Sequence, residues 1–224
     1  MTQRKTPWLL AALLPFLTLP AAARVQVHGH RGSRGTHPEN TLAGFREALR
    51  VGADVLELDL AVTKDDVLVV SHDPKLEPAL CLGPDGRGAT PLSSRTLTLA
   101  EVKRYDCGSR PNPRFPRQAA VPGERVPTLA EVLALAAGAG AIRFNVETKV
   151  FPAFPEAAPP PEAFAELVVR EVRAAKLTER VIVQSFDRRT LEAVKRLEPG
   201  LKTAMLTSDT LVDFAALAAA GKFD

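Results

Sequence analysis

The stretch DVLELDLAVT, residues 54–63, alternates leucines with acidic residues. In a β-strand, residues i and i+2 point to the same face, so Glu57 and Asp59 lie on one side and the leucines on the other. The leucine face predicts a strand packed on a core. Two carboxylates on the opposite face of a buried strand repel each other and lose hydration, so the pattern also predicts a cation between them.

Strand and helix patterns alternate along the rest of the chain. The expected strands are 25–30, 54–63, 67–72, 141–149, 180–186 and 201–207, and the expected helices are 40–52, 96–106, 127–138, 162–176, 188–198 and 210–221. Such βα units imply an α/β fold with a mainly parallel sheet, either doubly wound or closed as a (β/α)₈ TIM barrel. Polar residues at the strand ends favour the TIM barrel. The chain stops where another strand is expected, so the barrel is apparently truncated after the sixth strand and helix.

Two segments stand apart from this alternation. Residues 1–23 have a basic start, an apolar run and an Ala-rich cleavage site, the pattern of a secretory signal peptide, which leaves 24–224 as the barrel domain. Export to the periplasm, or secretion, is therefore expected. The irregular stretch 74–127, rich in Pro, Gly and Arg, is predicted to be a small insertion between the third strand and its helix.

Charge and cysteine content narrow the range of partners. Without residues 1–23 the chain has 27 Lys and Arg against 26 acids, so its net charge near +1 indicates neither a nucleic-acid partner nor a membrane surface. The apolar run of the leader is too short for a stable membrane span. The only two cysteines, Cys81 and Cys107, favour a disulfide in an exported protein, with two unpaired thiols as the alternative. The sequence carries no signal for the oligomeric state.

Chemically active side chains gather at the ends of the expected strands. Three carboxylates there, Glu57, Asp59 and Glu147, form an oxygen-only ligand set that suits a divalent cation, Ca²⁺ or Mg²⁺. His30 and His72 each end a strand and supply a base and an acid for one displacement. Basic groups for an anionic substrate come from Arg31 and Lys149. Together they predict phosphoryl transfer at the carboxyl end of a barrel.

Weaker assignments complete the set. Gln184 ends the strand before Phe186 and is expected to line the pocket. His28 shares the inward face with His30 but lies deeper, so we expect a hydrogen-bonded interior histidine. His37 is expected in a loop.

The ordered motifs HRG (30–32), PENT (38–41), ELDLAVTKDD (57–66), VVSHD (69–73), NVETK (145–149) and QSF (184–186) resemble those of the glycerophosphodiester phosphodiesterase family. The resemblance runs from Val27 to about Leu206. It implies a (β/α)₈ barrel that hydrolyses glycerophosphodiesters to glycerol 3-phosphate and an alcohol, with an insertion capping the barrel mouth. Family members end with two further strands, which this chain lacks.

The resemblance also implies roles for the residues that match these motifs. His30 and His72 do acid–base work, and Arg31 and Lys149 contact phosphate. The metal is bound by Glu57, Asp59 and Glu147, and Glu39 of PENT lies beside the site.

Several alternatives stay open at this point. The nucleophile is water or the substrate's own vicinal hydroxyl, which would give a cyclic intermediate, and either histidine can be the base. A phospholipase D of the sphingomyelinase type shares the barrel, the paired histidines and the metal-binding carboxylates. An inactive, truncated binding protein is the rival from another class.

Overall fold

The structure is a computed structural model that describes residues 25–209 and 211–224. The predicted signal peptide, 1–23, lies outside the described residues. The strands are β1 (His28–His30), β2 (Val55–Val62), β3 (Leu68–Val70), β4 (Arg143–Thr148), β5 (Val181–Ser185) and β6 (Lys202–Met205). The α-helices are α1 (Leu42–Arg50), α2 (Leu99–Val102), α3 (Leu129–Ala134), α4 (Pro161–Ala174), α5 (Arg188–Leu197) and α6 (Phe214–Gly221).

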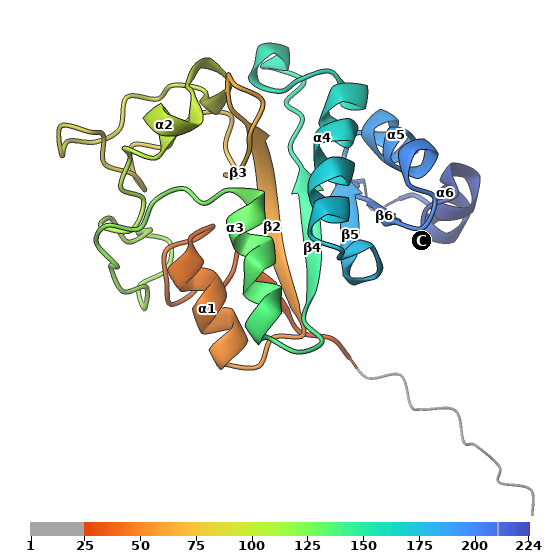
Figure 1. Ribbon diagram of the computed structural model, residues 1–224, viewed down its shortest axis with the longest axis horizontal. Coiled ribbons are helices and arrows are strands. Elements are labelled where there is room, and N and C mark those ends of the chain that lie inside the picture. The colour runs from red at the N-terminus through yellow and green to blue at the C-terminus, as the bar shows by residue number, and fades with distance from the viewer. Residues whose placement is uncertain (1–24, 210) are drawn as a thin grey trace, which may run out of the picture.

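Five strands form a parallel sheet in the order β1-β2-β4-β5-β6. Helices cover one side of it, as Figure 1 shows for α1, α3, α4 and α5. This is the α/β architecture predicted from the sequence. Within the described residues β1 and β6 do not pair with each other, so the sheet curves as part of a TIM barrel without closing.

The third predicted strand is the exception to the parallel order, because β3 pairs antiparallel with β2. The connection between them is too short for a crossover, which a parallel neighbour requires. The turn is fixed by Thr63, whose backbone N–H donates to the Val67 carbonyl at 3.0 Å, and by the left-handed Asp66 (φ 57°). As a consequence β2 pairs directly with β4, and the two acidic strands are neighbours.

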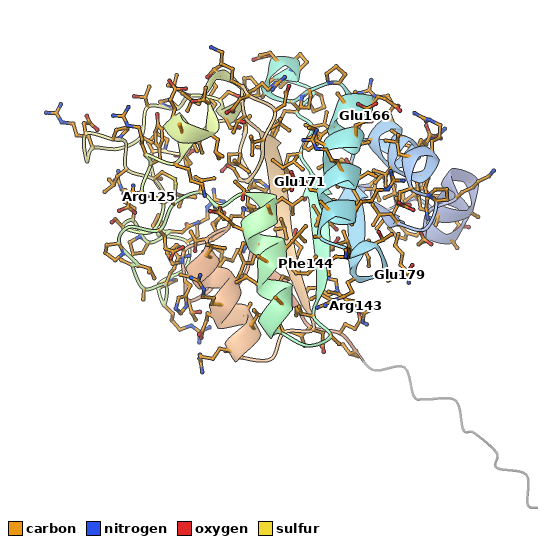
Figure 2. The ribbon with its side chains drawn as sticks, viewed as in Figure 1. Arg125, Arg143, Phe144, Glu166, Glu171 and Glu179 are labelled. Carbon is orange, nitrogen blue, oxygen red and sulfur yellow. A yellow bond between two sulfur atoms is a disulfide. The ribbon has the colours of Figure 1, made fainter. Side chains whose placement is uncertain are left out.

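The alternation in 54–63 has the predicted effect on packing. Leu56, Leu58 and Leu60 have no exposed surface and belong to the core beneath the helices. Burying each such side chain contributes about 2 kcal/mol to stability. The same core includes Phe144 of β4, which is labelled in Figure 2, whereas Glu166 lies on the exposed side of α4.

Helix ends follow local sequence signals, although some helices are shorter than predicted. The side chain of Thr41 accepts the backbone N–H of Gly44 and begins α1. A capping box of Thr128 and Glu131 begins α3, which continues as a 3₁₀ helix after Ala134. The helix predicted at 96–106 is a single α-helical turn, α2. No helix in 25–209 or 211–224 combines the length and hydrophobicity that a transmembrane span requires.

Residues 74–127 build a second, smaller core beside the β2–β3 hairpin, drawn in yellow and green in Figure 1. The predicted disulfide joins Cys81 to Cys107, with 4.0 Å between their Cα atoms. The carboxylate of Asp106 accepts the backbone N–H groups of Gly108, Ser109 and Gly123 and fixes the neighbouring turn. Little regular secondary structure is present, so the disulfide and such side-chain hydrogen bonds hold this segment together.

Candidate functional site

Three buried carboxylates meet on the inner face of the sheet, opposite the helices. Asp59 and Glu147 are register partners on β2 and β4, and Glu57 lies two residues before Asp59 on the same face. One oxygen from each carboxylate lies within 4.8 Å of the others. Only 1–7% of each residue is exposed to solvent. The strand register thus concentrates three potential negative charges in one water-poor place.

Two cations reach into this cluster. Lys149 Nζ lies 2.8 Å from Glu147 Oε1 and 3.8 Å from Asp59 Oδ1. Arg31 Nε lies 3.3 Å from Asp59 Oδ2, and Nη1 donates to Glu39 Oε1 at 2.7 Å. Because Arg31 is shared with Glu39, the two cations do not balance the three carboxylates.

The imbalance appears in the protonation behaviour of the carboxylates. Burial, reinforced by the nearby Asp59, raises the pKa of Glu57 to about 7. Burial also raises the pKa of Glu147, although Lys149 opposes the change. The pocket therefore holds more negative charge than its own cations stabilise, as expected for a site that binds a further cation.

The HRG motif forms a tight turn after β1 that aims a backbone donor at the cluster. Arg31 and Gly32 both adopt left-handed conformations, with φ of 53° and 79°. The Arg31 N–H consequently donates to Glu57 Oε2 at 2.8 Å. Glycine is required at 32, since a Cβ there would lie 2.7 Å from the backbone of Gly44 in α1. A strained arginine beside a carboxylate cluster points to a functional turn.

Amide side chains orient the carboxylates, and of these the sequence analysis assigned only Gln184 to the site. Asn40 Nδ2 donates to Asp59 Oδ2 at 3.0 Å, and its left-handed backbone (φ 54°) donates to the Arg31 carbonyl. Gln184 Nε2 donates to Glu57 Oε1 at 3.1 Å, and Gln184 Oε1 accepts from Asn145 Nδ2 at 3.0 Å. Asn145 lies two residues before Glu147 on the same strand, so it shares the face of that carboxylate. Asn40 gave no separate signal, because Asn before a helix usually acts as a cap.

The two histidines follow different strands, since His30 is the last residue of β1 and His72 lies two residues after β3. His30 Nε2 lies 3.8 Å from Glu57 Oε2, and 52% of the His30 side chain is exposed. Burial, followed by the charges of Arg34 and Arg31, lowers the pKa of His30, so the ring is mostly neutral at pH 7. His72 Nδ1 lies 2.9 Å from Asp73 Oδ1, which orients its ring. That hydrogen bond is the main cause of the lowered pKa of Asp73.

His72 and Arg31 line one cavity, which also receives residues of segment 74–127. The connection between the segment and the site is direct. Asn112 Nδ2 donates to Glu39 Oε2 at 3.0 Å, and Glu39 in turn holds Arg31. Nothing in the sequence pointed to Asn112, because its partner is 73 positions away.

His28 and His37 have different surroundings from the reacting groups. The prediction that His28 is an interior histidine is wrong, because its residue is exposed. The open sheet leaves the inner face of β1 uncovered near its start. His37 is half-buried, with Nδ1 3.2 Å from the Thr36 hydroxyl, and its carbonyl accepts from Gln118 Nε2 at 2.8 Å.

Comparison with known proteins places this site in context. Residues 30–223 match the Glycerophosphoryl diester phosphodiesterase family. The chain belongs to this family. A glycerophosphodiester phosphodiesterase of Caldanaerobacter subterraneus subsp. tengcongensis is 34% identical over 191 residues, which are 84% of this chain and 68% of the relative. A relative from Bacillus subtilis is also 34% identical, over 87% of this chain and 67% of its own length. The family's named members are phosphoric diester hydrolases.

Solved structures of family members share the architecture. A glycerophosphoryl diester phosphodiesterase structure from Silicibacter pomeroyi superimposes with a TM-score of 0.79 at 33% identity, over 88% of this chain and 72% of that chain. A phosphodiesterase from Oleispira antarctica was solved with the product sn-glycerol-3-phosphate. It superimposes with a TM-score of 0.70 at 25% identity, over 89% of this chain and 72% of that chain. Both matches cover most of this chain and 72% of the matched chain.

The residues fit the divalent cation expected of this family. Three carboxylates supply hard oxygen ligands that are close enough for one ion to be bound by all of them. Burial raises the pKa of Glu57 to about 7, and a bound cation would stabilise its charged form. Asn40 and Gln184 hold two of the three carboxylates in fixed orientations, as outer-shell partners do in metal sites.

Proposed function

We propose that this chain hydrolyses glycerophosphodiesters to glycerol 3-phosphate and an alcohol, with a divalent cation, Ca²⁺ or Mg²⁺, bound by Glu57, Asp59 and Glu147. The observation that carries the proposal is the buried cluster of these three carboxylates beside His30 and two basic side chains. His72 lines the adjoining cavity. When bound, the cation supplies positive charge to the phosphate oxygens and to a neighbouring hydroxyl.

The chain's own residues bind and orient the phosphodiester. Arg31 and Lys149 are placed to contact its anionic oxygens, because both lie at the rim of the carboxylate cluster with fixed side chains. Glu39 accepts a hydrogen bond from Arg31, and this contact keeps both side chains near the proposed position of the phosphate. Gln184 was predicted to touch substrate, but its amide is engaged by Glu57 and Asn145, which supports a positioning role.

His30 and His72 exchange protons with the reacting oxygens. One imidazole takes the proton from the attacking oxygen as the new P–O bond forms. The other gives a proton to the alcohol oxygen as its P–O bond breaks. The neutral state of His30 and the orientation of His72 by Asp73 support this pairing. Water or the vicinal glycerol hydroxyl is the attacking group.

The signal peptide predicted at residues 1–23 also bears on where the protein is located. We place the enzyme outside the cytoplasm, in the periplasm or secreted, where the Cys81–Cys107 disulfide is stable. A water-soluble diester is the natural substrate in this reading, with no nucleic acid and no membrane insertion involved.

The test is hydrolysis of glycerophosphocholine by the full chain, followed as release of glycerol 3-phosphate. We expect turnover that EDTA abolishes and that added Mg²⁺ or Ca²⁺ restores. His30→Ala and His72→Ala should each lower kcat by about 100-fold or more, the usual contribution of acid–base catalysis. Near-normal turnover in either variant contradicts the proposed proton transfers.

Other outcomes identify the two rival functions. Turnover of lysophospholipid but not of the soluble diester indicates a lipid phosphodiesterase of the same fold. Absence of all turnover from a folded, metal-loaded chain indicates a binding protein. Glu166→Gln on the exposed side of α4 is the control variant and should behave like the original chain.

A further inference from the structure

A cavity of about 490 Å³ lies between the turn after β1, the end of β3 and segment 74–127. Its wall includes Arg31 and His72, so it adjoins the place proposed for the reacting phosphate. The segment contributes Arg114 and Phe115 on the opposite side. A molecule bound at the carboxylate cluster can therefore extend into this cavity beyond its phosphate.

The charged groups of the cavity divide into paired and unpaired ones. Two carboxylates are engaged, since Glu39 accepts from Arg31 and Asn112, and Asp73 from His72. In the part of the chain that the structure describes, the guanidinium groups of two further lining residues, Arg34 and Arg114, have no carboxylate within 4.0 Å. One lining carboxylate of the opposite sign remains, Glu77, whose Oε1 accepts the Ala79 N–H at 3.1 Å.

Arg34 is held in place by an aromatic ring rather than by an acid. Its guanidinium carbon lies 4.9 Å from the centre of the Phe115 ring, a cation–π contact that leaves the charge unneutralised. A fixed, uncompensated guanidinium beside a cavity attracts an anion.

We infer that this cavity is a subsite for the alcohol half of the substrate and that Arg34 and Arg114 select alcohols bearing a second negative charge, a carboxylate or a phosphate. The inference rests on the proposed function. The glycerol half of a glycerophosphodiester carries only hydroxyl groups, so a second anion has to belong to the alcohol. Arg31 is committed to Glu39 and Asp59 at the reacting centre, which leaves the other two arginines for this charge.

Glu77 sets the limit of this preference. The cavity lining holds three arginines and three carboxylates, whose charges cancel, so selection depends on the two arginines that have no carboxylate partner among the described residues. A purely cationic alcohol such as choline is repelled by these two guanidinium groups, whereas an alcohol that carries a carboxylate beside an ammonium group finds charges of both signs. Specificity then comes from repulsion as well as attraction.

The test compares kcat/KM for two diesters that share the reacting phosphate, glycerophosphoserine and glycerophosphocholine. We expect the serine-to-choline ratio to exceed one in the full chain and to fall about tenfold in the double variant Arg34→Gln/Arg114→Gln, the size of a lost charge-assisted contact. The ratio cancels any effect of Arg34 on His30. It should also fall as NaCl increases, since charges at an open cavity are screened.

Two further variants sharpen the result. Glu77→Gln should raise the same ratio, a change opposite in sign to that of the arginine variants. Arg117→Gln is the matched control, because it removes the same charge from an exposed position of the same segment that does not line the cavity. Its ratio should equal that of the original chain.

Each outcome decides between the two proposals. If both diesters are hydrolysed with a ratio that Arg34→Gln/Arg114→Gln leaves unchanged, the subsite is wrong and the proposed function stands. If neither diester is hydrolysed, the proposed function is wrong, and calorimetric binding of glycerophosphoserine to the full chain then tests the subsite independently. Equal binding by the original chain and by the double variant overturns the subsite.

Discussion

The two halves of the site are built in opposite ways. On the sheet, the positions of Glu57, Asp59 and Glu147 follow from strand register, and every carboxylate points away from a fully buried leucine or valine layer. Segment 74–127 has little regular structure and is held by one disulfide, a small core and side-chain hydrogen bonds. The first half is rigid because backbone pairing fixes it, whereas the second depends on a few local contacts.

The reacting groups and the groups expected to select the substrate therefore lie in different parts of the fold. Groups that must keep sub-ångström spacing are on adjacent strands, where movement requires breaking the sheet. Groups that face the variable part of a substrate are on the segment, where sequence can change without disturbing the barrel. Asn112 joins the halves by holding Glu39. Changes in the sheet should thus abolish the reaction, and changes in the segment should alter binding.

The largest effect is expected from Asp59→Asn on the sheet side. Asp59 is 1% exposed and contacts Arg31, Lys149 and Asn40, and it is one of the three carboxylates proposed to bind the cation, so its removal takes away a charged ligand. We expect kcat/KM to fall by at least about 100-fold, corresponding to a loss of 3 kcal/mol or more.

A second readout separates this effect from misfolding. Mg²⁺ or Ca²⁺ should raise the Tm of the original chain, and Asp59→Asn should lose that increase. An Asp59→Asn variant that keeps both the metal-induced rise in Tm and its turnover contradicts the metal site.

The disulfide tests the segment side. Replacing Cys81 and Cys107 together by Ser should lower the free energy of unfolding of this segment by about 3 kcal/mol, because the bridge closes a loop between residues 26 apart. Limited proteolysis should then cut first within 74–127, and KM should rise more than kcat falls. Loss of kcat with unchanged KM would argue against the division between the two halves.

Asp106→Asn probes the hydrogen bonds that hold the segment. Burial alone would raise the pKa of Asp106, but donors from Gly108, Gly123 and Ser109 outweigh it and the pKa lies below its usual value. A lowered folded-state pKa stabilises the protein above the unfolded pKa of about 4, and this contribution is lost as pH falls through the lower folded value.

Asp106→Asn should therefore lower stability by about 1–2 kcal/mol at pH 7, the scale of hydrogen bonds to a carboxylate. The difference from the original chain should shrink as pH falls below about 4, because Asp106 then gains a proton first in the unfolded chain and, at lower pH, in the folded chain. Thermal unfolding of both chains at several pH values measures this difference in stability. A difference that is constant from neutral to acidic pH contradicts this account.

The smallest effect is expected at the junction between the halves. Asn112→Ala removes one hydrogen bond to Glu39, which loosens Arg31 without touching the carboxylate cluster. We expect KM for the diester to rise about fivefold, corresponding to about 1 kcal/mol, with kcat nearly unchanged. Asn112→Gln should recover part of the affinity, and Arg117→Ala should show no change. An unaltered KM in Asn112→Ala would contradict the inference that this hydrogen bond connects the segment to the reacting site.

Much of this site could be predicted from local sequence patterns. Alternation in 54–63 and 143–149 places Glu57, Asp59, Glu147 and Lys149 on one face, since a strand repeats every two residues. The expected strand ends at 30 and 72 predicted that both histidines lie at the same end of the fold. In the structure β3 is antiparallel, and His72 lines a cavity together with Arg31. The two cysteines and the export signal indicated the disulfide, which the structure contains.

The remainder depended on contacts between distant parts of the chain. The antiparallel course of β3, the exposure of His28 and the pairing of Asn40 with Asp59 had no local signature. Asn112 lies in a segment whose sequence shows no periodicity, so its hydrogen bond to Glu39 was not predictable.

Local sequence patterns were therefore enough to identify the carboxylates, histidines and basic residues of the site and the strand face of each carboxylate. Only the tertiary structure decided that Asp59 is opposite Glu147, that Arg31 donates its backbone N–H to Glu57, and that the segment lies over the cavity. The physical reason is that residue periodicity is local, whereas strand register and loop packing are set by the burial of surfaces from residues far apart in the chain.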